Sequence, residues 1–262
     1  MQIHHQYIIL TGAASGIGKE LLILLSKYKC HILAVDLNEA LLNETISNIS
    51  NPQAQIKAYQ ADLSTEIDNN ALFEYALQIF TQIDIFIANA GFAYYEKLEK
   101  PNWEHIEKIY QVNVFSPIYS LLKMREINKG RAYYVCMTAS AMAKMGLAGY
   151  ALYGATKASL DRFADAYRYE TDDKGVLGLV YPIATKTNFF EKAGNAPLLF
   201  PSQTAQIVAK AILRGILKNK KTMIPSKIFW LSHILSFMQE LLNKPYQLYT
   251  KKFLKEKLSK EN

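Results

Sequence analysis

The chain has 262 residues, a length that fits one large α/β domain better than two separate domains. Half of the residues are hydrophobic and a fifth are charged, which is typical of a soluble globular protein and excludes a disordered, collagen-like or coiled-coil chain. The two cysteines, Cys30 and Cys136, lie in apolar stretches and are too few for a disulfide framework or a cysteine-based metal site. They favour a reducing, intracellular setting, and we expect no bound metal.

The net charge of +7 is concentrated at the C-terminal end. Residues 214–262 hold 11 Lys or Arg and 3 Asp or Glu, a net charge of +8, so the rest of the chain sums to about −1. No long apolar segment follows a basic stretch at the N-terminus, and no run of 18 uncharged apolar residues occurs. We therefore expect neither a signal peptide nor a spanning helix, and a cytoplasmic protein that is either free or peripheral at a membrane.

Short β-rich runs alternate with longer helical patterns over the first 190 residues. Strands are expected at residues 7–10, 31–35, 55–60, 83–88, 132–137 and 175–181, and helices at 17–28, 39–49, 67–81, 103–125 and 153–171. Several of the strands are nearly continuous apolar runs, as in a parallel sheet that is covered on both faces. The alternation predicts an α/β fold, a doubly wound parallel sheet flanked by helices in a single domain.

A glycine-rich segment, residues 11–18, joins the first expected strand to the first expected helix. A pyrophosphate needs free backbone N–H groups and the positive end of a helix dipole. Glycines permit the tight turn, the close approach of the phosphate and close packing of helix on strand. The expected cofactor contacts in this loop are Gly12, Ser15, Gly16, Ile17 and Gly18. The alternative is an ordinary glycine-rich turn, and the position after the first strand favours the cofactor.

Asp36 ends the second expected strand. Its carboxylate can accept hydrogen bonds from both ribose hydroxyls of NAD and would repel the extra phosphate of NADP. No Lys or Arg follows at Leu37 or lies in the glycine loop, which favours NAD and leaves NADP as the alternative. An ordinary turn or helix-capping Asp is the other interpretation of this residue.

Five motifs, in order and at matching spacing, resemble those of the short-chain dehydrogenase/reductase family of the classical type. Residues 11–18 are similar to its TGxxxGxG loop, and Asn89-Ala90-Gly91 to its NAG segment. Tyr153 and Lys157 have its YxxxK spacing, and Ser140 precedes Tyr153 by 13 residues. The resemblance runs over residues 7–215, about four-fifths of the chain.

The resemblance implies a Rossmann-type fold and a nicotinamide cofactor. It implies a catalytic tetrad of Asn113, Ser140, Tyr153 and Lys157. It also implies cofactor contacts from residues that follow the later strands: Asp62, Leu63, Asn89, Ala90, Gly91, Tyr153, Lys157, Pro182 and Thr187. Family members commonly form dimers or tetramers, so a homodimer or homotetramer built on the helices at 103–125 and 153–171 is expected by resemblance.

The residues themselves support this chemistry. Tyr153 and Lys157 lie four residues apart on an expected helix and therefore share one face. A nearby ammonium and an oxidised nicotinamide would favour the phenolate and lower a tyrosine pKa from its usual value near 10. Tyr153 can then exchange a proton with an alcohol or carbonyl, and Ser140 can hydrogen-bond the same substrate oxygen. By resemblance, Asn113 holds a water that links Lys157 to solvent. Taken singly, each of the four has an ordinary structural interpretation.

One position departs from the family pattern. The family usually has Pro-Gly after the sixth strand, and this chain has Pro182-Ile183, followed by Thr187 at the usual place. Ile183 restricts the backbone and adds bulk beside the expected nicotinamide pocket. We expect Thr187 still to reach the cofactor carboxamide, with the pose of the substrate altered.

Two apolar segments bear on the substrate and on partners. Residues 188–200 form the expected substrate loop, and its aromatic and aliphatic side chains either bind an apolar substrate or pack on the body. Met142, Met145 and Leu147 would line the same pocket. Residues 225–262 form an amphipathic, basic extension to a domain of residues 1–224, which either packs on the protein or lies on an anionic membrane.

The sequence therefore predicts an NAD(P)-dependent oxidoreductase that acts on an alcohol/carbonyl pair, with a lipophilic small-molecule substrate and Tyr153 as general acid/base. The alternative is a catalytically silent NAD(P)-binding sensor or scaffold, attached to a membrane through its tail. No nucleic acid is expected as a partner, because the basic run lacks a nucleic-acid-binding motif.

Overall fold

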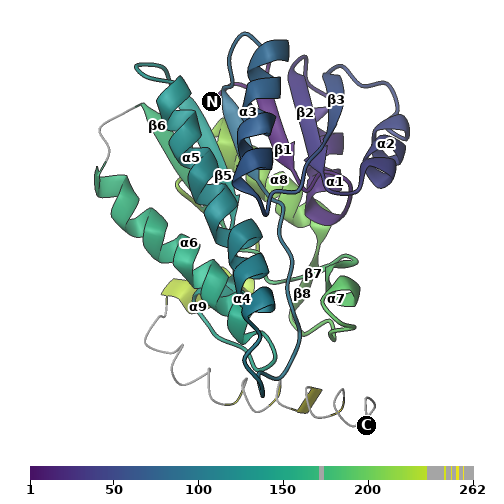
Figure 1. The fold of residues 1–262 in the computed structure, drawn as a ribbon, viewed down its shortest axis with the longest axis vertical. Coiled ribbons are helices and arrows are strands. Elements are labelled where there is room, and N and C mark those ends of the chain that lie inside the picture. Colours follow the sequence, from purple (N-terminus) through teal and green to yellow (C-terminus); the bar gives the residue numbers. More distant parts are fainter. Residues whose placement is uncertain (171–173, 235–244, 246–248, 250–251, 254–255, 257–262) are drawn as a thin grey trace.

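The structure is a computed structural model that describes all residues except 171–173, 235–244, 246–248, 250–251, 254–255 and 257–262. Within the described residues, seven strands form one parallel sheet in the order β3-β2-β1-β4-β5-β6-β9. The strands are β1 (Tyr7–Thr11), β2 (His31–Asp36), β3 (Gln55–Gln60), β4 (Ile85–Ala88), β5 (Tyr133–Thr138), β6 (Gly175–Val180) and β9 (Thr222–Met223). The predicted doubly wound parallel sheet is thus confirmed (Figure 1).

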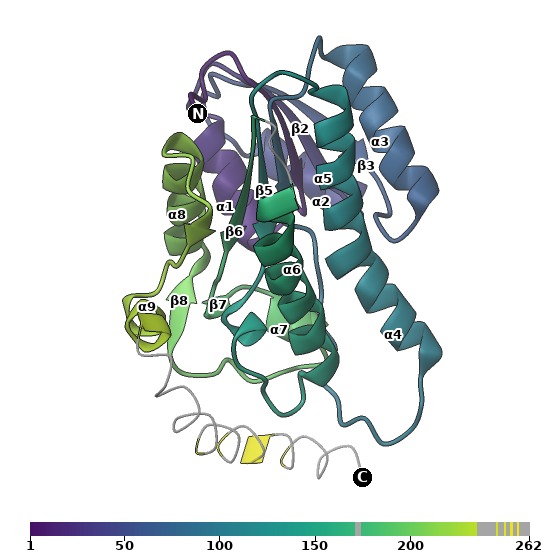
Figure 2. The same cartoon turned by 90° about the vertical axis from the view of Figure 1, so that its left-hand side faces the viewer.

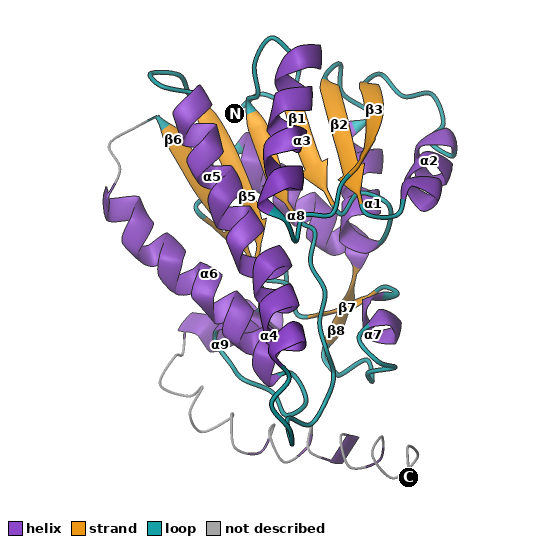
Figure 3. Cartoon of the chain, viewed as in Figure 1, coloured by secondary structure: helices purple, strands orange, loops and turns teal. Residues whose placement is uncertain are grey.

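Helices cover both faces of this sheet (Figure 3). They are α1 (Gly16–Leu25), α2 (Glu39–Ser47), α3 (Glu66–Ile79), α4 (Trp103–Tyr110), α5 (Ser116–Ile127), α6 (Ala151–Glu170), α7 (Phe189–Lys192), α8 (Ala205–Leu217) and α9 (Lys227–Ile234). A second small sheet pairs β7 (Ala184–Lys186) with β8 (Ser202–Thr204). Figure 2 shows the main sheet between α1 and α8 on one side and α3, α5 and α6 on the other.

Two hydrophobic cores fill the space between the sheet and these layers. On one face, Leu22 of α1 and Ile212 of α8 pack against Ile8 and Ile32 of the sheet. On the other face, side chains of α3, α5 and α6 pack against the same strands from the opposite side. The central strands β1, β4 and β5 are buried on both faces, which explains their nearly continuous apolar sequences.

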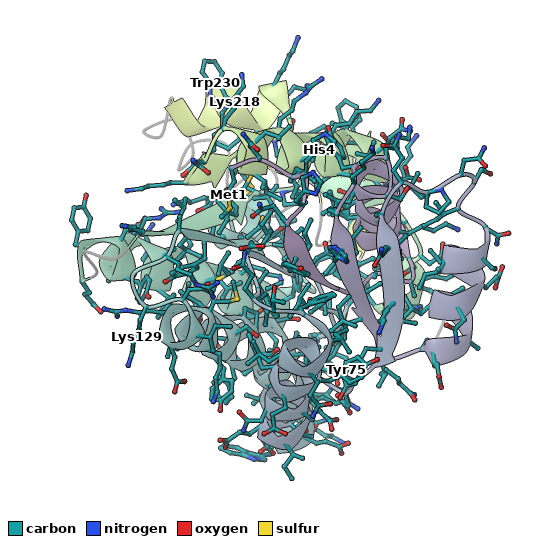
Figure 4. All side chains as sticks on the ribbon, turned by 90° about the horizontal axis from the view of Figure 1, so that it is seen from above. Met1, His4, Tyr75, Lys129, Lys218 and Trp230 are labelled. Atoms are coloured by element: carbon teal, nitrogen blue, oxygen red, sulfur yellow. The ribbon has the colours of Figure 1, made fainter. Side chains whose placement is uncertain are left out.

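The N-terminus is held at the end of α8. The ammonium of Met1 donates to the carbonyl oxygen of Ile216 at 3.1 Å and to the side-chain oxygen of Asn219 at 2.7 Å. Figure 4, seen from above, shows Met1 and Lys218 on the same side of the molecule. Trp230 is 53% exposed.

The structure differs from the sequence predictions in two places. The single helix expected at 103–125 is divided, because a π-helical turn, Gln111–Phe115, separates α4 from α5. Periodicity does not distinguish this turn from the α-helix around it. No helix or strand is expected from the sequence at 201–224, and that stretch contains β8, α8 and β9, of which β9 has only two residues.

The C-terminal extension is described in part. Helix α9 includes the predicted apolar position Ile228, which is 62% exposed, whereas Leu235, Met238 and Leu242 lie outside the described residues. Of the predicted basic positions, Lys252 is described, and Lys251, Lys255, Lys257 and Lys260 are not. Among the described helices, none is both long and apolar enough to cross a membrane.

Candidate active site

The predicted functional residues gather at one edge of the sheet. In a parallel sheet all carboxyl ends of the strands point the same way, and the crevice beyond them is the usual ligand site. The glycine loop follows β1, and Asp36 ends β2; Asp62, Asn89 and Ser140 follow β3, β4 and β5. Pro182 and Thr187 follow β6. The fold therefore brings together at this edge residues from six separate parts of the chain.

The glycine loop has the backbone that its sequence predicts. Gly12 and Gly16 adopt positive φ angles of +65° and +56°, which side-chain-bearing residues rarely adopt. A Cβ on Gly12 would lie 2.9 Å from the Cα of Ala90, and one on Gly18 would collide with the carbonyl oxygen of Gly12. The loop is thus packed so closely against the segment after β4 that only glycine fits.

The start of α1 is suited to an anion. Ser15 is the N-cap, and its side chain makes no capping hydrogen bond to the described part of the helix. The first turn contains no acidic side chain. The N–H groups of this turn, including that of Ile17, are therefore open to a phosphate at the positive end of the helix dipole.

Asp36 is tied to the glycine loop. Its carboxylate accepts hydrogen bonds from the backbone N–H of Ala14 at 3.0 Å and of Asn38 at 3.1 Å. Asn38, rather than Asp36, caps α2 by accepting from the N–H of Leu41. The turn interpretation and the ribose interpretation of Asp36 are therefore compatible, since each carboxylate oxygen has a further lone pair for a hydroxyl.

The segments after β3 and β4 are held by side-chain amides. Asn89 donates to the carbonyl oxygens of Thr11 and Gly12 at 3.2 and 3.3 Å and accepts from the Thr138 hydroxyl at 3.2 Å, so it links three strand ends. After β3, the Asp62 carboxylate accepts from the N–H of Ser64, and the buried Leu63 is held through its carbonyl oxygen by Asn69. Ala90 and Gly91 continue the Asn89 segment into the site.

Tyr153 lies at the start of α6 with its ring buried. It is hydrogen-bonded to the side chain of Ser140, and its ring is 5.5 Å from the Lys157 ammonium. Ser140 is also the N-cap of the 3₁₀ turn Ala141–Ala143, because its hydroxyl accepts from the N–H of Met142 at 3.1 Å. The capping interpretation of Ser140 therefore holds together with its contact to Tyr153.

Burial governs the ionisation of the Tyr153–Lys157 pair. It raises the pKa of Tyr153 to about 12, and the hydrogen bond from Ser140 only partly opposes this. It also lowers the pKa of Lys157 from its usual 10.5 to about 8. In the protein alone, desolvation therefore raises the tyrosine pKa. The lowered pKa expected with an oxidised nicotinamide beside Tyr153 stays a prediction.

Lys157 and Asn113 flank Gly91. The Lys157 ammonium donates to the carbonyl oxygen of Thr138 at 2.8 Å. A Cβ on Gly91 would lie 2.9 Å from the Asn113 side-chain oxygen and 3.5 Å from the Lys157 nitrogen. Asn113 is fully buried in the π-helical turn and is fixed by two hydrogen bonds with the backbone of Phe92. The π-helical turn thus places Asn113 beside the ammonium.

The segment after β6 closes the site over the glycine loop. A Cβ on Gly16 would lie 3.2 Å from the Thr187 methyl carbon, so Thr187 sits directly beside the phosphate loop. The carbonyl oxygen of Pro182 accepts from the N–H of Ala141 at 2.8 Å. Ile183, expected beside the nicotinamide pocket, is partly buried and packs against the core on the α3–α5–α6 face.

An apolar cluster adjoins Tyr153, and we call it the substrate wall. It comprises Ala93, Tyr95, Ile109, Leu147, Tyr150, Tyr153, Phe190, Ala193, Ala196 and Leu199. Met142, Met145 and Phe189 are partly buried against it, and so is Phe253 of the C-terminal extension. Residues of the predicted substrate loop therefore do pack on the body, and the Phe189 ring lies 5.5 Å from the Tyr153 ring, centroid to centroid.

Three residues in or next to the site were not predicted from the sequence. Tyr95 and Tyr150 are buried in the substrate wall with ring centroids 5.0 Å apart, but seventeen tyrosines in the chain gave no reason to select them. Asp161 lies one helical turn after Lys157 and is 1% exposed. Its four-residue spacing after Lys157, which places it on the same helix face as Tyr153 and Lys157, is the sequence pattern that indicates it.

Comparisons with known proteins agree with this geometry. The sequence model of the family described as short chain dehydrogenase matches residues 6–197. A diacetyl reductase [(S)-acetoin forming] from Staphylococcus epidermidis is 29% identical over 193 residues, which are 70% of this chain and 73% of that protein. The short-chain dehydrogenase/reductase family 16C member 6 from Bos taurus is 27% identical over 248 residues, 91% of this chain and 77% of that protein.

Solved structures share the fold. A short chain dehydrogenase/reductase from Burkholderia phymatum in complex with NAD superimposes with a TM-score of 0.81 at 17% identity, covering 92% of this chain and 96% of that one. A short-chain dehydrogenase from Sphingobium yanoikuyae in complex with NADPH gives 0.78 at 22% identity, with 90% and 95% covered. The family model spans most of the chain and includes the glycine loop, Ser140, Tyr153 and Lys157. The chain belongs to the short chain dehydrogenase family of oxidoreductases.

Proposed function

We propose that the protein transfers a hydride between NAD and an alcohol or carbonyl substrate, with Tyr153 as general acid/base. The observation that carries the proposal is the meeting of Tyr153, Ser140 and Lys157 beside an uncapped, glycine-lined helix start. The first turn of α1, which has no acidic side chain and no side-chain cap from the described part of the chain, offers N–H groups to the pyrophosphate of a dinucleotide at this edge. The bound nicotinamide would donate or accept the hydride.

Tyr153 would act on the substrate oxygen as a proton donor or acceptor. With a pKa of about 12, its phenol is protonated at neutral pH, which is the form that donates to a carbonyl oxygen. Ser140 would hydrogen-bond the same oxygen and stabilise the charge that develops on it. Lys157, held by the Thr138 carbonyl oxygen, would supply positive charge beside the phenol whenever the phenolate forms.

The cofactor preference for NAD rests on Asp36. Its carboxylate stands at the end of β2 beside the glycine loop, where the ribose hydroxyls of a dinucleotide would lie. Leu37 follows it, so the adjacent position offers no cation for the 2′-phosphate of NADP. Solved relatives are described with either NAD or NADPH, so the family alone does not decide the preference.

A ketone with apolar substituents is the substrate class that the substrate wall supports. Its side chains are aliphatic and aromatic, and they surround the ring of the proposed acid. The relative described as a diacetyl reductase and a solved relative described as a bulky-bulky ketone specific alcohol dehydrogenase support a ketone. The first panel to screen is therefore diacetyl, straight-chain ketones of increasing length, and aromatic ketones.

The test follows NADH oxidation with this panel in wild type and in Tyr153→Phe. The variant keeps the ring and its packing but has no proton to donate, so turnover should fall by about 10²–10⁴. NADH affinity should stay within about twofold, because the hydroxyl is not needed for that binding. Full activity of Tyr153→Phe would sink the proposed role. If no ketone or alcohol is turned over while NADH binds, the sensor or scaffold becomes the better function.

Association of copies through α4, α5 and α6 stays a prediction. Trp103 of α4 is 77% exposed, Phe115 of the π-helical turn before α5 is 60% exposed, and Tyr169 of α6 is 93% exposed. Light scattering after size-exclusion chromatography tests it: a dimer or tetramer is expected, and a monomer at micromolar concentration would contradict it. The membrane contact of residues 225–262 also stays a prediction, since most of that segment lies outside the described residues.

A further inference from the structure

Asp161 extends the catalytic face of α6 by one more turn. Tyr153, Lys157 and Asp161 follow one another at four-residue steps, so all three lie on the same face of the helix. Their exposed fractions fall along this series, from 8% for Tyr153 to 4% for Lys157 and 1% for Asp161. A buried carboxylate at this place needs strong partners, because burying an unpaired charge is costly.

Three side chains supply those partners. The Lys144 ammonium donates to Oδ2 of Asp161 at 2.7 Å, and the Arg162 guanidinium donates to the same oxygen at 2.6 Å. The Tyr181 hydroxyl donates to Oδ1 at 2.6 Å. Burial alone would raise the pKa of Asp161, but these hydrogen bonds outweigh it and hold the pKa below its usual value. The carboxylate is therefore ionised at neutral pH.

The three partners of Asp161 lie on different segments of the chain. Arg162 is a neighbour on α6 and its side chain is 68% exposed. Lys144 ends the short turn that begins at Ser140, and its side chain is 19% exposed. Tyr181 immediately precedes Pro182 at the end of β6. Two of the three bonds thus connect α6 to segments that carry other residues of the site.

These two segments are also joined to each other. The N–H of Ala141 donates to the carbonyl oxygen of Pro182 at 2.8 Å, and that of Ala139 donates to Val180 at 2.9 Å. The Lys144 ammonium lies 5.9 Å from the centre of the Tyr181 ring. Asp161 therefore closes a ring of contacts that runs from α6 through the Ser140 turn to Pro182 and back.

We propose that Asp161 is a positioning residue, which fixes the Ser140 turn relative to Tyr153 through Lys144 and fixes the Pro182 end of β6 through Tyr181. Asp161 itself touches neither substrate nor cofactor. The proposal rests on the proposed function for its effect on turnover, but its structural part stands on the contacts alone. Asn in place of Asp161 keeps the shape and loses the charge that holds Lys144.

The first arm of the test needs no substrate. Hydrogen exchange by mass spectrometry is compared in wild type, Asp161→Asn and the control Asp165→Asn. Asp165 lies one turn further along α6, pairs with Arg162 at 3.0 Å and has a half-exposed side chain, so its loss removes a charge without opening the ring. Peptides covering residues 138–145 should exchange about tenfold faster in Asp161→Asn and unchanged in Asp165→Asn. Unchanged exchange of 138–145 in both variants would overturn the proposal.

The second arm measures coupling to Ser140. A misplaced Ser140 should lower kcat about 10- to 100-fold in Asp161→Asn, with KM for NADH unchanged. In a Ser140→Ala background the same substitution should change kcat by less than about twofold, because the group it positions is gone. Effects that multiply would show that Asp161 acts by general stability rather than through Ser140, and would overturn the proposal.

Milder variants cover the case in which Asp161→Asn does not fold. Lys144→Met removes the ion pair that links Asp161 to the Ser140 turn, and Tyr181→Phe removes only the hydroxyl that donates to the Asp161 carboxylate. Lys144→Met should reproduce the faster exchange of 138–145, and Tyr181→Phe should affect residues 180–185 more. A wild type that turns over none of the panel would count against the proposed function alone, and the exchange arm would still decide the role of Asp161.

Discussion

The glycine loop, Asp36 and Asn89 line the carboxyl edge of the sheet, which we call the cofactor edge. The cofactor edge and the substrate wall adjoin at Tyr153 but are built in different ways. At the cofactor edge, directional hydrogen bonds fix the side chains: Asn89, which follows β4, bonds to the ends of β1 and β5, and Asp36 bonds to the glycine loop. In the substrate wall, Phe190, Leu199 and Leu147 are held by apolar contact. Directional bonds impose particular residue types at particular spacings, whereas apolar packing accepts many residues of similar volume.

This difference explains why the sequence predicts the residues of the cofactor edge but does not predict the substrate. A glycine at a positive φ, or an amide that must donate twice, cannot be replaced freely, so it leaves a pattern in the sequence. A wall of aromatic and aliphatic groups requires only that the segment be rich in apolar residues, with no fixed pattern in the sequence. We expect substitutions at the cofactor edge to have large effects that depend on single atoms, and substitutions in the wall to have graded effects that depend on volume.

The largest effect is expected at Gly18. A Cβ there would collide with the carbonyl oxygen of Gly12, which is backbone and cannot swing away. Gly18→Ala should lower the free energy of unfolding by about 3 kcal/mol and abolish NADH binding. Gly154→Ala is the matched control, since its Cβ would meet nothing closer than 3.7 Å, and it should stabilise α6 by up to about 1 kcal/mol. Chemical denaturation measures both, and equal effects would contradict the packing argument.

The buried ammonium of Lys157 should make stability depend on pH. Its pKa is about 8 in the folded protein and 10.5 when exposed, so the unfolded chain binds more protons between these values and stability rises with pH across them. The free energy of unfolding of wild type minus that of Lys157→Met should therefore increase by up to about 3 kcal/mol between pH 7 and pH 10.5. Taking the difference between wild type and variant cancels the contributions of the buried tyrosines and thiols to the pH dependence. A difference that does not change with pH would contradict the burial of the Lys157 ammonium.

A smaller effect is expected in the substrate wall. Phe190 is 9% exposed within the wall, and Phe200, in the same loop, is 75% exposed. Phe190→Leu should lower the free energy of unfolding by about 1 kcal/mol and change the relative KM values of short and long ketones. Phe200→Leu should stay within about 0.5 kcal/mol and leave the KM values unchanged. If the two variants behave alike, the loop does not form the wall as described.

The sequence was sufficient for six of the seven strands of the main sheet, for the glycine loop and for the place of Tyr153 on a helix, because each depends on local periodicity or on fixed spacing. It was insufficient where long-range packing decides the structure. The π-helical turn that carries Asn113 has the same apolar pattern as the helix around it. The pKa of Tyr153 is set by burial under Phe189 and Tyr150, which are distant or unremarkable in sequence. The contacts of Asp161 join three segments, and single-sequence patterns do not reveal such pairings.

The most direct test of the account is titration of NADH and of NADPH into the purified protein, followed by nicotinamide fluorescence. The Asp36 carboxylate and the open first turn of α1 predict that NADH binds with a Kd at least about tenfold lower than that of NADPH. Asp36→Ala should remove most of that difference. A preference for NADPH would contradict the role given to Asp36, and binding of neither would contradict the dehydrogenase site as a whole.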